Sequence, residues 1–331
     1  MRYTRLGQSG LRVSRLALGT MTFGQWTTEK EAFAIMDKAV EMGINLFDTA
    51  DIYDGTSAPA GNGLTEEVIG RWFSLGGGRR DYVVLATKVH GAMVPVLPSD
   101  PNCRRGLNAR KIIRGCEASL RRLQTDRIDL YQLHHVDREC PVHEWLDAMT
   151  TLQRQGKIYY VGSSNFAGWD IATACLSAEI RNNPRLICEQ SIYNLTNRMV
   201  ELEVLPACRH FGLGMIPWSP LAQGLLSGAV AKAVSGHRNR PHVEKMLAEK
   251  HDQVVSYEQF CRAIGEDPAN VALAWLLANP EVTAPVIGPR TPKQLVDSIR
   301  AVEMKLTDEM MKQLDLIFPG PNGEAPNAYA W

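Results

Sequence analysis

Four ionisable side chains stand where short apolar runs of the sequence end: Asp48, Tyr53, Lys88 and His134. Asp48 and Tyr53 belong to the stretch NLFDTADIY, in which a run typical of a buried strand gives way to polar residues. Taken singly, each has an ordinary explanation, because Asp favours turns and most lysines are solvated surface groups. The combination of an Asp, a Tyr, a Lys and a His at such positions indicates a candidate catalytic set.

This set suits proton transfer to an oxygen atom that develops negative charge. A free tyrosine has a pKa of about 10, and an adjacent ammonium group favours the phenolate and lowers that value. Lys88 can supply the ammonium, and Asp48 can pair with it where an unpaired buried charge would be costly. His134 can donate a hydrogen bond to a substrate carbonyl and orient it. The chemistry is that of carbonyl reduction, which requires a hydride donor.

The sequence holds no pattern typical of a metal site or of the common nucleotide sites. His134 and His135 are adjacent, and adjacent residues of a strand point to opposite faces, so we expect them not to share one site. The pair His143-Glu144 lacks the second histidine of a metalloprotease helix. The segment GNGLTE, which starts at Gly61, departs from the dinucleotide fingerprint at its last glycine, and no P-loop pattern is present. We therefore expect no metal, and a dinucleotide bound by other means.

One candidate for such binding is the segment VIGPRTPKQL at residues 286–295, which reads as a strand end followed by a helix start. Arg290 stands beside Thr291 at that start. Free backbone N–H groups at helix starts bind phosphate, and arginine adds a bidentate charge. An arginine at an ordinary turn is an equally good interpretation of this segment alone.

Short β-rich runs alternate with longer segments of helical spacing about eight times along the chain. The expected strands are RLALGT, INLFDTA, YVVLATK, IDLYQLHH, IYYVGSSN, LICEQS, LGMIPWS and PVIG. The expected helices cover residues 28–42, 64–74, 108–122, 143–155, 168–180, 200–211, 268–278, 291–301 and 307–317. In the third helix one face carries apolar residues at a 3.6-residue period and should pack on a sheet. These residues are Ile112, Ile113, Cys116, Leu120 and Leu123.

Apolar strands joined by helices favour an α/β protein built as a single (β/α)8 TIM barrel, and a doubly wound open sheet is the alternative. In a barrel the active site lies at the carboxyl ends of the strands, where the candidate catalytic residues stand. Turn signals from Gly7 to Gly10 indicate an N-terminal β-hairpin. Residues 54–63 and 225–256 are expected to form long loops at the C-terminal face.

The amino-acid composition restricts which classes of protein and partner are consistent with the sequence. The 331 residues are 45% hydrophobic and 22% charged, which is ordinary for a soluble globular protein, and we expect residues 1–331 to form one domain. The 36 basic and 36 acidic residues give no net charge, which does not favour nucleic acid as a partner. The absence of a signal peptide and of a run of about 18 apolar residues predicts a cytoplasmic protein with no membrane partner. The seven cysteines include no C-x-x-C pair, which indicates reduced thiols. No feature of the sequence indicates an oligomer.

Over essentially its whole length the chain resembles the aldo-keto reductases. The segments that carry the resemblance are GTMTFG near the start, DTADIYDG at 48–55, LATK at 85–88, RIDLYQLHHVD at 127–137, GKIYYVGSSNF at 156–166, EQSIYNL at 189–195, PWSPLAQGLLSG at 217–228 and VIGPRTPKQL at 286–295. Their order and spacing make the resemblance specific. Within the family, the chain is similar to the bacterial branch related to potassium-channel β subunits and to NDP-hexose 2,3-enoyl reductases.

The resemblance implies reduction of aldehyde or ketone carbonyls by NADPH, which would lie extended across the barrel mouth. It implies Tyr53 as the proton donor, assisted by Asp48, Lys88 and His134. The residues that it implies around the cofactor are Gly19, Thr20, Met21, Asp48, Ser164, Asn165, Gln190, Trp218, Ser219, Pro220, Leu221, Gly224, Leu226, Gly288, Arg290, Thr291, Gln294, Asp297 and Ser298. Those expected around a small-molecule carbonyl substrate are Phe23, Trp26, Tyr53, His134, His135 and Phe166.

Within the cofactor set, the resemblance gives each group a role. Ser164, Asn165 and Gln190 would hold the carboxamide, and Trp218 would stack on the nicotinamide ring. Ser219, Leu221 and Gly224 would line the pyrophosphate. The adenosine end would be surrounded by Gly288, Arg290, Gln294 and Asp297. Arg290 would favour the 2′-phosphate, and therefore NADP over NAD.

Departures from the family pattern leave alternatives open. Ile287 stands where relatives often have proline, Ser298 stands where many have asparagine, and the loop at 54–63 is longer than usual. One alternative is an NDP-hexose 2,3-enoyl reductase of deoxysugar biosynthesis, to which the ending IFPGPNGEAPNAYAW is similar. Basic residues that would serve a sugar nucleotide there are Arg104, Arg105, His237, Arg238 and Arg240. The other alternative is a slow-turnover redox-sensor subunit that binds NADP(H).

Overall fold

The computed structural model describes residues 1–53, 61–93, 102, 104–234 and 241–328. In this described part, eight strands form one parallel sheet in the order β10-β3-β4-β5-β6-β7-β8-β9. The strands are β3 (Ala17–Gly19), β4 (Leu46–Asp48), β5 (Val84–Val89), β6 (Ile128–Leu133), β7 (Ile158–Ser164), β8 (Leu186–Gln190), β9 (Gly214–Met215) and β10 (Val286–Ile287). Each overlaps a segment predicted to be a strand, so the predicted order of strands is confirmed.

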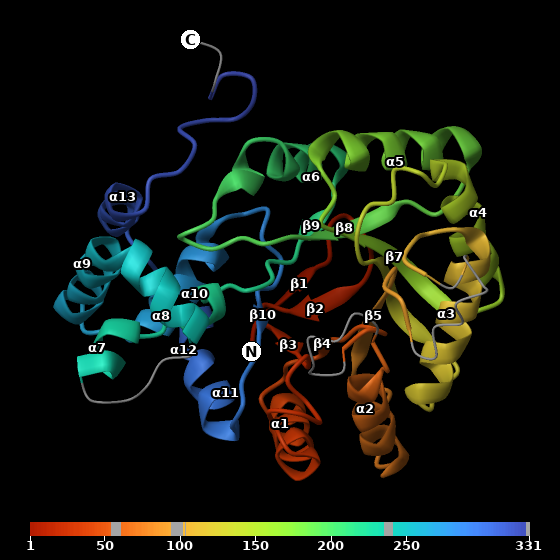
Figure 1. Ribbon diagram of the computed structural model, residues 1–331, viewed down its shortest axis with the longest axis horizontal. Helices are drawn as coiled ribbons and strands as arrows, with labels where there is room; N and C mark the ends of the chain where they lie inside the picture. The colour runs from red at the N-terminus through yellow and green to blue at the C-terminus, as the bar shows by residue number, and fades with distance from the viewer. Residues whose placement is uncertain (54–60, 94–101, 103, 235–240, 329–331) are drawn as a thin grey trace.

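The segment that precedes β10 closes the sheet into a barrel. The backbone N–H of Met215 donates to Glu281 at 3.0 Å, and Thr283 donates back to Met215 at 2.8 Å. Val286 then donates to Pro217 at 2.8 Å, and β10 pairs in parallel with β3. Both edges of the sheet are thereby joined, and helices surround it (Figure 1). The predicted (β/α)8 barrel is confirmed.

Most of the helices begin and end within two residues of their predicted bounds. They are α1 (Glu29–Glu41), α2 (Leu64–Ser74), α3 (Ala109–Arg122), α4 (Val142–Arg154), α5 (Gly168–Arg181), α10 (Pro268–Ala278) and α13 (Asp308–Ile317). Local signals fix their starts: Thr28 and Glu31 form a capping box at α1, and the Asn108 side chain accepts from the third residue of α3. On α3, Ile112 and Cys116 are fully buried, as the 3.6-residue period predicts.

Two predicted helices are divided in the structure. Residues 200–211 form a short 3-10 helix, η2 (Met199–Glu201), followed by α6 (Val204–Phe211). Residues 291–301 form α11 (Pro292–Ser298) and the first half of α12 (Arg300–Glu303).

The prediction of a long loop over residues 225–256 was wrong. After a short 3-10 turn, η3 (Ala222–Gly224), this region holds α7 (Ala229–Val234), α8 (Pro241–Glu249) and the start of α9 (His251–Ala263). Val254, Tyr257 and Cys261 recur three or four residues apart and are fully buried, where they pack with residues of α10 in an apolar cluster. That spacing is a helical signal. Residues 235–240, which include the whole basic segment GHRNR, and residues 54–60 of the other predicted loop lie outside the described residues.

The predicted N-terminal hairpin is present and covers one end of the barrel. Strands β1 (Tyr3–Arg5) and β2 (Arg12–Ser14) pair antiparallel. Gly7 lies between them with φ +57°, and a Cβ there would come within 2.5 Å of the Gly212 oxygen. Gln8 donates to that same oxygen at 2.8 Å. Because Gly212 precedes β9, the hairpin lies at the amino ends of the strands and leaves their carboxyl ends uncovered.

Among the described helices, none is both long enough and apolar enough to cross a membrane.

Candidate active site

Lys88 links the two ionisable residues of the β4 end. Its Nζ donates to Asp48 Oδ2 at 2.7 Å, to Tyr53 Oη at 3.1 Å and to the Thr49 carbonyl at 2.8 Å. Lys88 lies on β5 and Asp48 ends β4, and these two strands pair in parallel, so neighbouring strand ends bring the groups together. The structure thus places three of the four predicted catalytic residues in one hydrogen-bonded chain.

Two amide side chains donate hydrogen bonds to Oδ1 of Asp48, the carboxylate oxygen that does not bind Lys88. Gln190 Nε2 at the end of β8 donates to Oδ1 at 2.8 Å, and Gln132 Nε2 on β6 donates to the same oxygen at 3.2 Å. Gln190 was expected at the cofactor, and here its amide donates to the Asp48 carboxylate. Gln132 is missing from the predicted set, although it stands two residues before His134. Interior positions of a barrel strand alternate, and that alternation could have identified it.

Burial raises the pKa of Tyr53 above its usual value, and the Lys88 ammonium offsets this effect only in part. The expected net lowering of the Tyr53 pKa is therefore not found, because that expectation included the ammonium but not the loss of solvation of the phenolate. Burial alone would lower the pKa of Lys88, but Asp48 and Tyr53 outweigh it and the net shift is upward. At neutral pH the lysine is charged and the tyrosine carries its proton.

His134 completes the group as a neutral imidazole. Its ring lies edge-on to Tyr53 with 5.8 Å between ring centroids. Burial, the Lys88 charge and the neighbouring histidines lower the pKa of His134 well below its usual value. Nδ1 is buried without a hydrogen-bond partner in the described part of the chain. Nε2 is therefore the nitrogen left to contact a substrate.

His134 and His135 do not point to opposite faces, contrary to expectation. Their rings stack with 5.1 Å between centroids and an interplanar angle of 12°. The physical reason is that β6 ends at Leu133, so the alternation of a strand no longer applies to either histidine. His135 is exposed at the mouth and His134 is buried.

The residues predicted for the carboxamide form one network at the ends of β7 and β8. Ser164 Oγ donates to the Gln190 carbonyl at 2.7 Å, and the Asn165 backbone N–H donates to the same oxygen at 3.0 Å. Asn165 has φ +59°, a left-handed conformation that is uncommon for a residue with a side chain. Its Nδ2 donates to the His134 carbonyl at 3.1 Å, and its Oδ1 accepts from Trp218 Nε1 at 3.0 Å. Five predicted site residues are therefore held together by direct contacts.

The predicted pyrophosphate loop follows Trp218 and turns sharply. Ser219 has φ +53° and Gly224 has φ +109°. Ser219 Oγ accepts from the backbone of Gln223 at 3.1 Å. Leu221 is half-buried and Pro220 buried, whereas Leu226 is fully buried in the cluster with α9 and α10. The Leu226 side chain therefore packs in the core and does not face the mouth.

The predicted adenosine end lies at the start of α11. The Thr291 side chain caps this helix by accepting from the Gln294 N–H at 3.2 Å, and Gln294 Oε1 accepts from the Arg290 N–H at 2.8 Å. The Arg290 guanidinium is exposed and forms no hydrogen bond or ion pair with any described residue. The other predicted residues of this end are exposed or half-buried: Gly288, Asp297 and Ser298.

The residues predicted at the β3 end and around the substrate differ in exposure. Thr20 donates through both its N–H and its Oγ1 to the Asp48 carbonyl, at 3.0 and 2.9 Å. Gly19 lies where a Cβ would come within 2.6 Å of the Val286 side chain. Met21 and Trp26 are exposed. Phe23 and Phe166 are buried among core residues, so their side chains pack inward rather than toward solvent at the mouth.

Two buried carboxyl groups next to the site have no counterpart among the predicted residues. Glu189 accepts from Ser163 Oγ at 2.5 Å, Ser191 Oγ at 2.6 Å and the Phe166 N–H at 3.1 Å. Burial raises its pKa to about 7. Asp51 is buried with neither oxygen hydrogen-bonded in the described part, and burial together with Glu66 raises its pKa to about 7. An acidic residue within a predicted buried strand was the available signal for Glu189.

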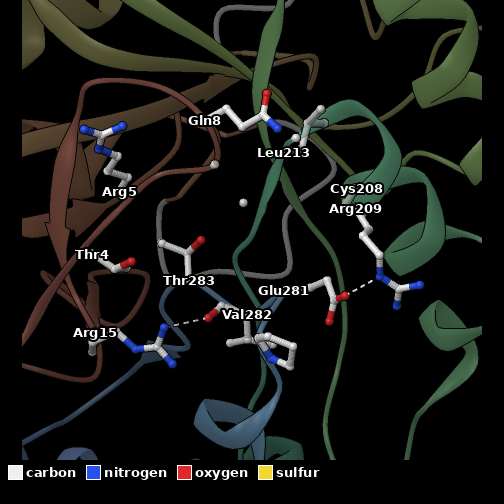
Figure 2. A pocket seen from close by; sticks show the side chains of 14 residues that line it. Thr4, Arg5, Gln8, Arg15, Cys208, Arg209, Leu213, Glu281, Val282 and Thr283 are labelled. Atoms are coloured by element: carbon white, nitrogen blue, oxygen red, sulfur yellow. Dashed lines mark hydrogen bonds and ion pairs between the residues drawn. The ribbon is translucent and has the colours of Figure 1, made fainter.

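A separate cavity of about 310 Å³ lies beneath the hairpin. Figure 2 shows Arg5 and Gln8 on its hairpin side and the Arg209–Glu281 ion pair on the other. Its residues border the amino ends of the strands, so it lies at the opposite end of the barrel from Tyr53. Among the described residues no cluster of three or more His, Cys, Asp or Glu side chains could hold a metal.

A barrel with polar side chains gathered at the carboxyl ends of its strands has the architecture of a barrel enzyme. The sequence pattern of the aldo/keto reductase family matches residues 15–318. The chain is 54% identical to the uncharacterized oxidoreductase YrpG of Bacillus subtilis, over 100% of both chains. It is 34% identical to a putative voltage-gated potassium channel subunit beta of Schizosaccharomyces pombe, over 94% of this chain and 92% of that one.

A third relative is the versiconal hemiacetal acetate reductase of Aspergillus parasiticus, 31% identical over 95% of this chain and 96% of its own. The chain belongs to the aldo/keto reductase family and is an oxidoreductase. Members of this family generally use NAD(P)H.

Proposed function

We propose that this protein reduces aldehyde or ketone carbonyls to alcohols with NADPH, using Tyr53 as the general acid. The observation that carries the proposal is the buried ammonium of Lys88, hydrogen-bonded at once to Asp48 and to the Tyr53 hydroxyl. A buried cation at that position stabilises the phenolate that forms when Tyr53 gives up its proton.

The residues divide the work as follows. NADPH, when bound, supplies the hydride to the carbonyl carbon. Tyr53 donates its proton to the carbonyl oxygen. Its raised pKa keeps the proton in place at neutral pH but makes the phenol a weaker acid, and the Lys88 ammonium offsets this effect in part by stabilising the phenolate. Asp48 keeps Lys88 charged, and the neutral His134 donates from Nε2 to the same carbonyl oxygen and orients it. Because Nδ1 of His134 is buried, the ring presents one polar edge to the substrate.

The proposed cofactor contacts agree with several features of the chain. Asn165 is fixed in a left-handed conformation by three partners, an arrangement that presents polar groups beside Trp218. At the other end, the Arg290 guanidinium is exposed and forms no hydrogen bond or ion pair within the described residues. A 2′-phosphate at Arg290 supports NADPH in preference to NADH.

The catalytic role is tested with Tyr53→Phe. We expect kcat for benzaldehyde reduction to fall by about 10²- to 10⁴-fold, the range of a lost general acid, while the NADPH dissociation constant measured by fluorescence quenching stays unchanged. The exposed Tyr159 supplies a matched control, and Tyr159→Phe is expected to leave both quantities as in the wild type. Wild-type turnover that survives in Tyr53→Phe would refute the role of Tyr53.

The cofactor preference is tested with Arg290→Ala. Loss of a charge-assisted contact with phosphate should weaken NADPH roughly tenfold and leave NADH unaffected. Lys293→Ala is the control, because Lys293 is an exposed neighbour already paired with Asp297 at 2.7 Å. Equal weakening of both cofactors would contradict a 2′-phosphate site at Arg290.

A redox-sensing subunit is the second candidate, supported by the full-length similarity to a putative potassium channel subunit beta. Under this alternative the same residues bind NADP(H) tightly and turn over slowly. Bound NADPH that remains unoxidised by a broad panel of aldehydes and ketones would favour it over the reductase.

A further inference from the structure

Two further imidazole rings lie at the rim of the barrel mouth, beside the ends of β5 and β6. Beyond His134, the ring of His135 continues the stack, and the ring of His90 lies edge-on to His135 with 5.4 Å between centroids. His90 directly follows β5, and His135 follows β6. The rings therefore form a continuous series that starts beside Tyr53, with the exposed His135 as the second ring and the half-buried His90 as the third.

Arg105 is held next to these rings by its backbone neighbours. The N–H of Gly106 donates to the His90 carbonyl at 3.0 Å, and the N–H of Leu107 donates to Asp137 Oδ2 at 2.9 Å. Both anchors lie at the carboxyl ends of the two strands. The Arg105 guanidinium is exposed and forms no hydrogen bond or ion pair within the described part of the chain.

Two cations, Arg105 and Lys111, and one carboxylate, Asp137, act on His90, so the charge around this cluster is net positive. Burial, with Arg105 contributing, lowers the pKa of His90 to about 4 and also lowers that of His135. Both rings are therefore neutral at pH 7, and each offers one N–H donor. Asp137 is the nearby carboxylate, and both its oxygens already accept backbone N–H groups, from Leu107 and Glu139. A guanidinium with no ion-pair partner among the described residues, beside neutral N–H donors, is a combination that favours an anion.

The cofactor phosphates do not account for this cluster. The residues proposed for the phosphates follow β9 and β10, whereas His90 and His135 follow β5 and β6. In the closed strand order, four strand positions separate β5 from β9 and β6 from β10, so the two pairs face each other across the mouth. The ring stack connects the cluster to Tyr53 and His134 instead, where the reacting carbonyl is proposed to lie.

We infer that Arg105, His90 and His135 bind an anionic group of the substrate, so that the preferred substrates are carbonyl compounds bearing a carboxylate or a similar anion. This inference rests on the reductase function proposed above. The carbonyl lies at Tyr53 and His134, and the anion lies one to two ring spacings farther along the stack. A benzaldehyde with a carboxylate at the para position spans about that separation.

The test compares 4-carboxybenzaldehyde with its uncharged methyl ester at saturating NADPH. The variants are Arg105→Ala, Arg105→Lys, which retains the charge, and Arg104→Ala as the matched control, since Arg104 is the adjacent exposed arginine. The methyl ester is the more electrophilic aldehyde, so each substrate is compared between variants rather than with the other substrate. KM and kcat are measured at low salt and at about 0.5 M salt, where the Debye length falls to about 4 Å.

We expect Arg105→Ala to raise KM for the carboxylate by about five- to tenfold, between the effects of an exposed ion pair and of a charged hydrogen bond. KM for the ester and both kcat values should stay unchanged. Arg105→Lys should recover part of the loss, Arg104→Ala should resemble the wild type, and salt should raise the wild-type KM for the carboxylate only.

An equal effect of Arg105→Ala on both substrates would overturn the inference, as would an equal effect of Arg104→Ala. If Arg105→Ala fails to fold, the wild-type salt dependence and Arg105→Lys decide, and a salt-independent KM for the carboxylate refutes the inference. Failure of the reductase proposal is distinguishable, because the wild type would then reduce neither aldehyde. In that case 4-carboxybenzaldehyde is titrated calorimetrically into the NADPH complex, and binding that does not depend on Arg105 overturns the inference.

Discussion

The buried ion pair of Asp48 and Lys88 allows a quantitative test of how the site is held together. The Lys88 side chain is fully buried and that of Asp48 is 5% exposed, with 2.7 Å between Nζ and Oδ2. Asp48→Asn keeps the size of the side chain and removes its charge. Lys88→Met keeps the length of the side chain and removes the ammonium. The double variant Asp48→Asn/Lys88→Met leaves neither charge.

Removing one partner of a buried ion pair costs about 3–5 kcal/mol of unfolding free energy, because the other charge remains buried and uncompensated. Each single variant here should lie near the lower value. Lys88 keeps its bonds to Thr49 and Tyr53, and Asp48 keeps its bonds to Gln132 and Gln190.

A chain of 331 residues has an unfolding entropy of about 0.7 kcal/mol/K, taking about 2.1 cal/mol/K per residue. A loss of about 3 kcal/mol therefore lowers Tm by about 4 °C. The double variant should lose about as much as one single variant, not twice as much.

The four proteins are compared by differential scanning calorimetry at pH 7. A matched surface pair, Lys38 and Glu41 at 2.7 Å, serves as control, and Lys38→Met should cost less than about 1 kcal/mol. A double variant whose Tm falls by the sum of the single effects would refute the reasoning, since the two charges would then not compensate each other. If Lys38→Met and Lys88→Met lost equal amounts of unfolding free energy, the argument that burial makes the loss of one charge costly would be refuted.

Two further predictions concern the hydrogen-bonded network at the ends of β7 and β8. Burial raises the pKa of Glu189 to about 7 in the folded protein, so the stability that this proton contributes is full below about pH 4.5 and is lost as pH rises through about 7. Glu189→Gln removes this pH dependence. The Tm of the variant should therefore rise relative to that of the wild type as the pH is raised from 5.5 to 8. A Tm difference that stays constant over this range would contradict the raised pKa of Glu189. Asn165→Gly relieves the left-handed strain at φ +59° but loses the bonds to His134 and Trp218. It should therefore be destabilised by about 1 kcal/mol and Asn165→Ala by more, and a glycine variant less stable than the alanine variant in thermal melts would contradict the strain argument.

The features set by local patterning could be predicted from the sequence. Buried strands and amphipathic helices carry their periods in the chain itself, as Ile112 and Cys116 show on α3, and helix starts carry caps such as Thr28 and Asn108. The rule that active sites lie at the carboxyl ends of barrel strands was then enough to gather Asp48, Lys88 and His134.

The features that depend on distant neighbours could not be predicted in this way. The upward shift of the Tyr53 pKa comes from burial of the phenol by segments distant in sequence, which no local pattern contains. The stacking of His134 on His135 depends on β6 ending one residue before them. Asp51 reads as one more turn aspartate, and its burial beside Glu66 follows only from the packing of α2.

The acid strength of Tyr53 is a property of several strands rather than of the tyrosine segment. Its hydroxyl takes the bond from Lys88 on β5, and the charge of Lys88 depends on Asp48 at the end of β4. The orientation of Asp48 depends in turn on amides from β6 and β8. A substitution at any of these strand ends therefore alters the pKa of Tyr53. Proton donation by Tyr53, as proposed, consequently depends on side chains from β4, β5, β6 and β8. Arg105 lies outside this chain of hydrogen bonds, so under the proposed function substrate preference can change at Arg105 while the bonds to Tyr53 are kept.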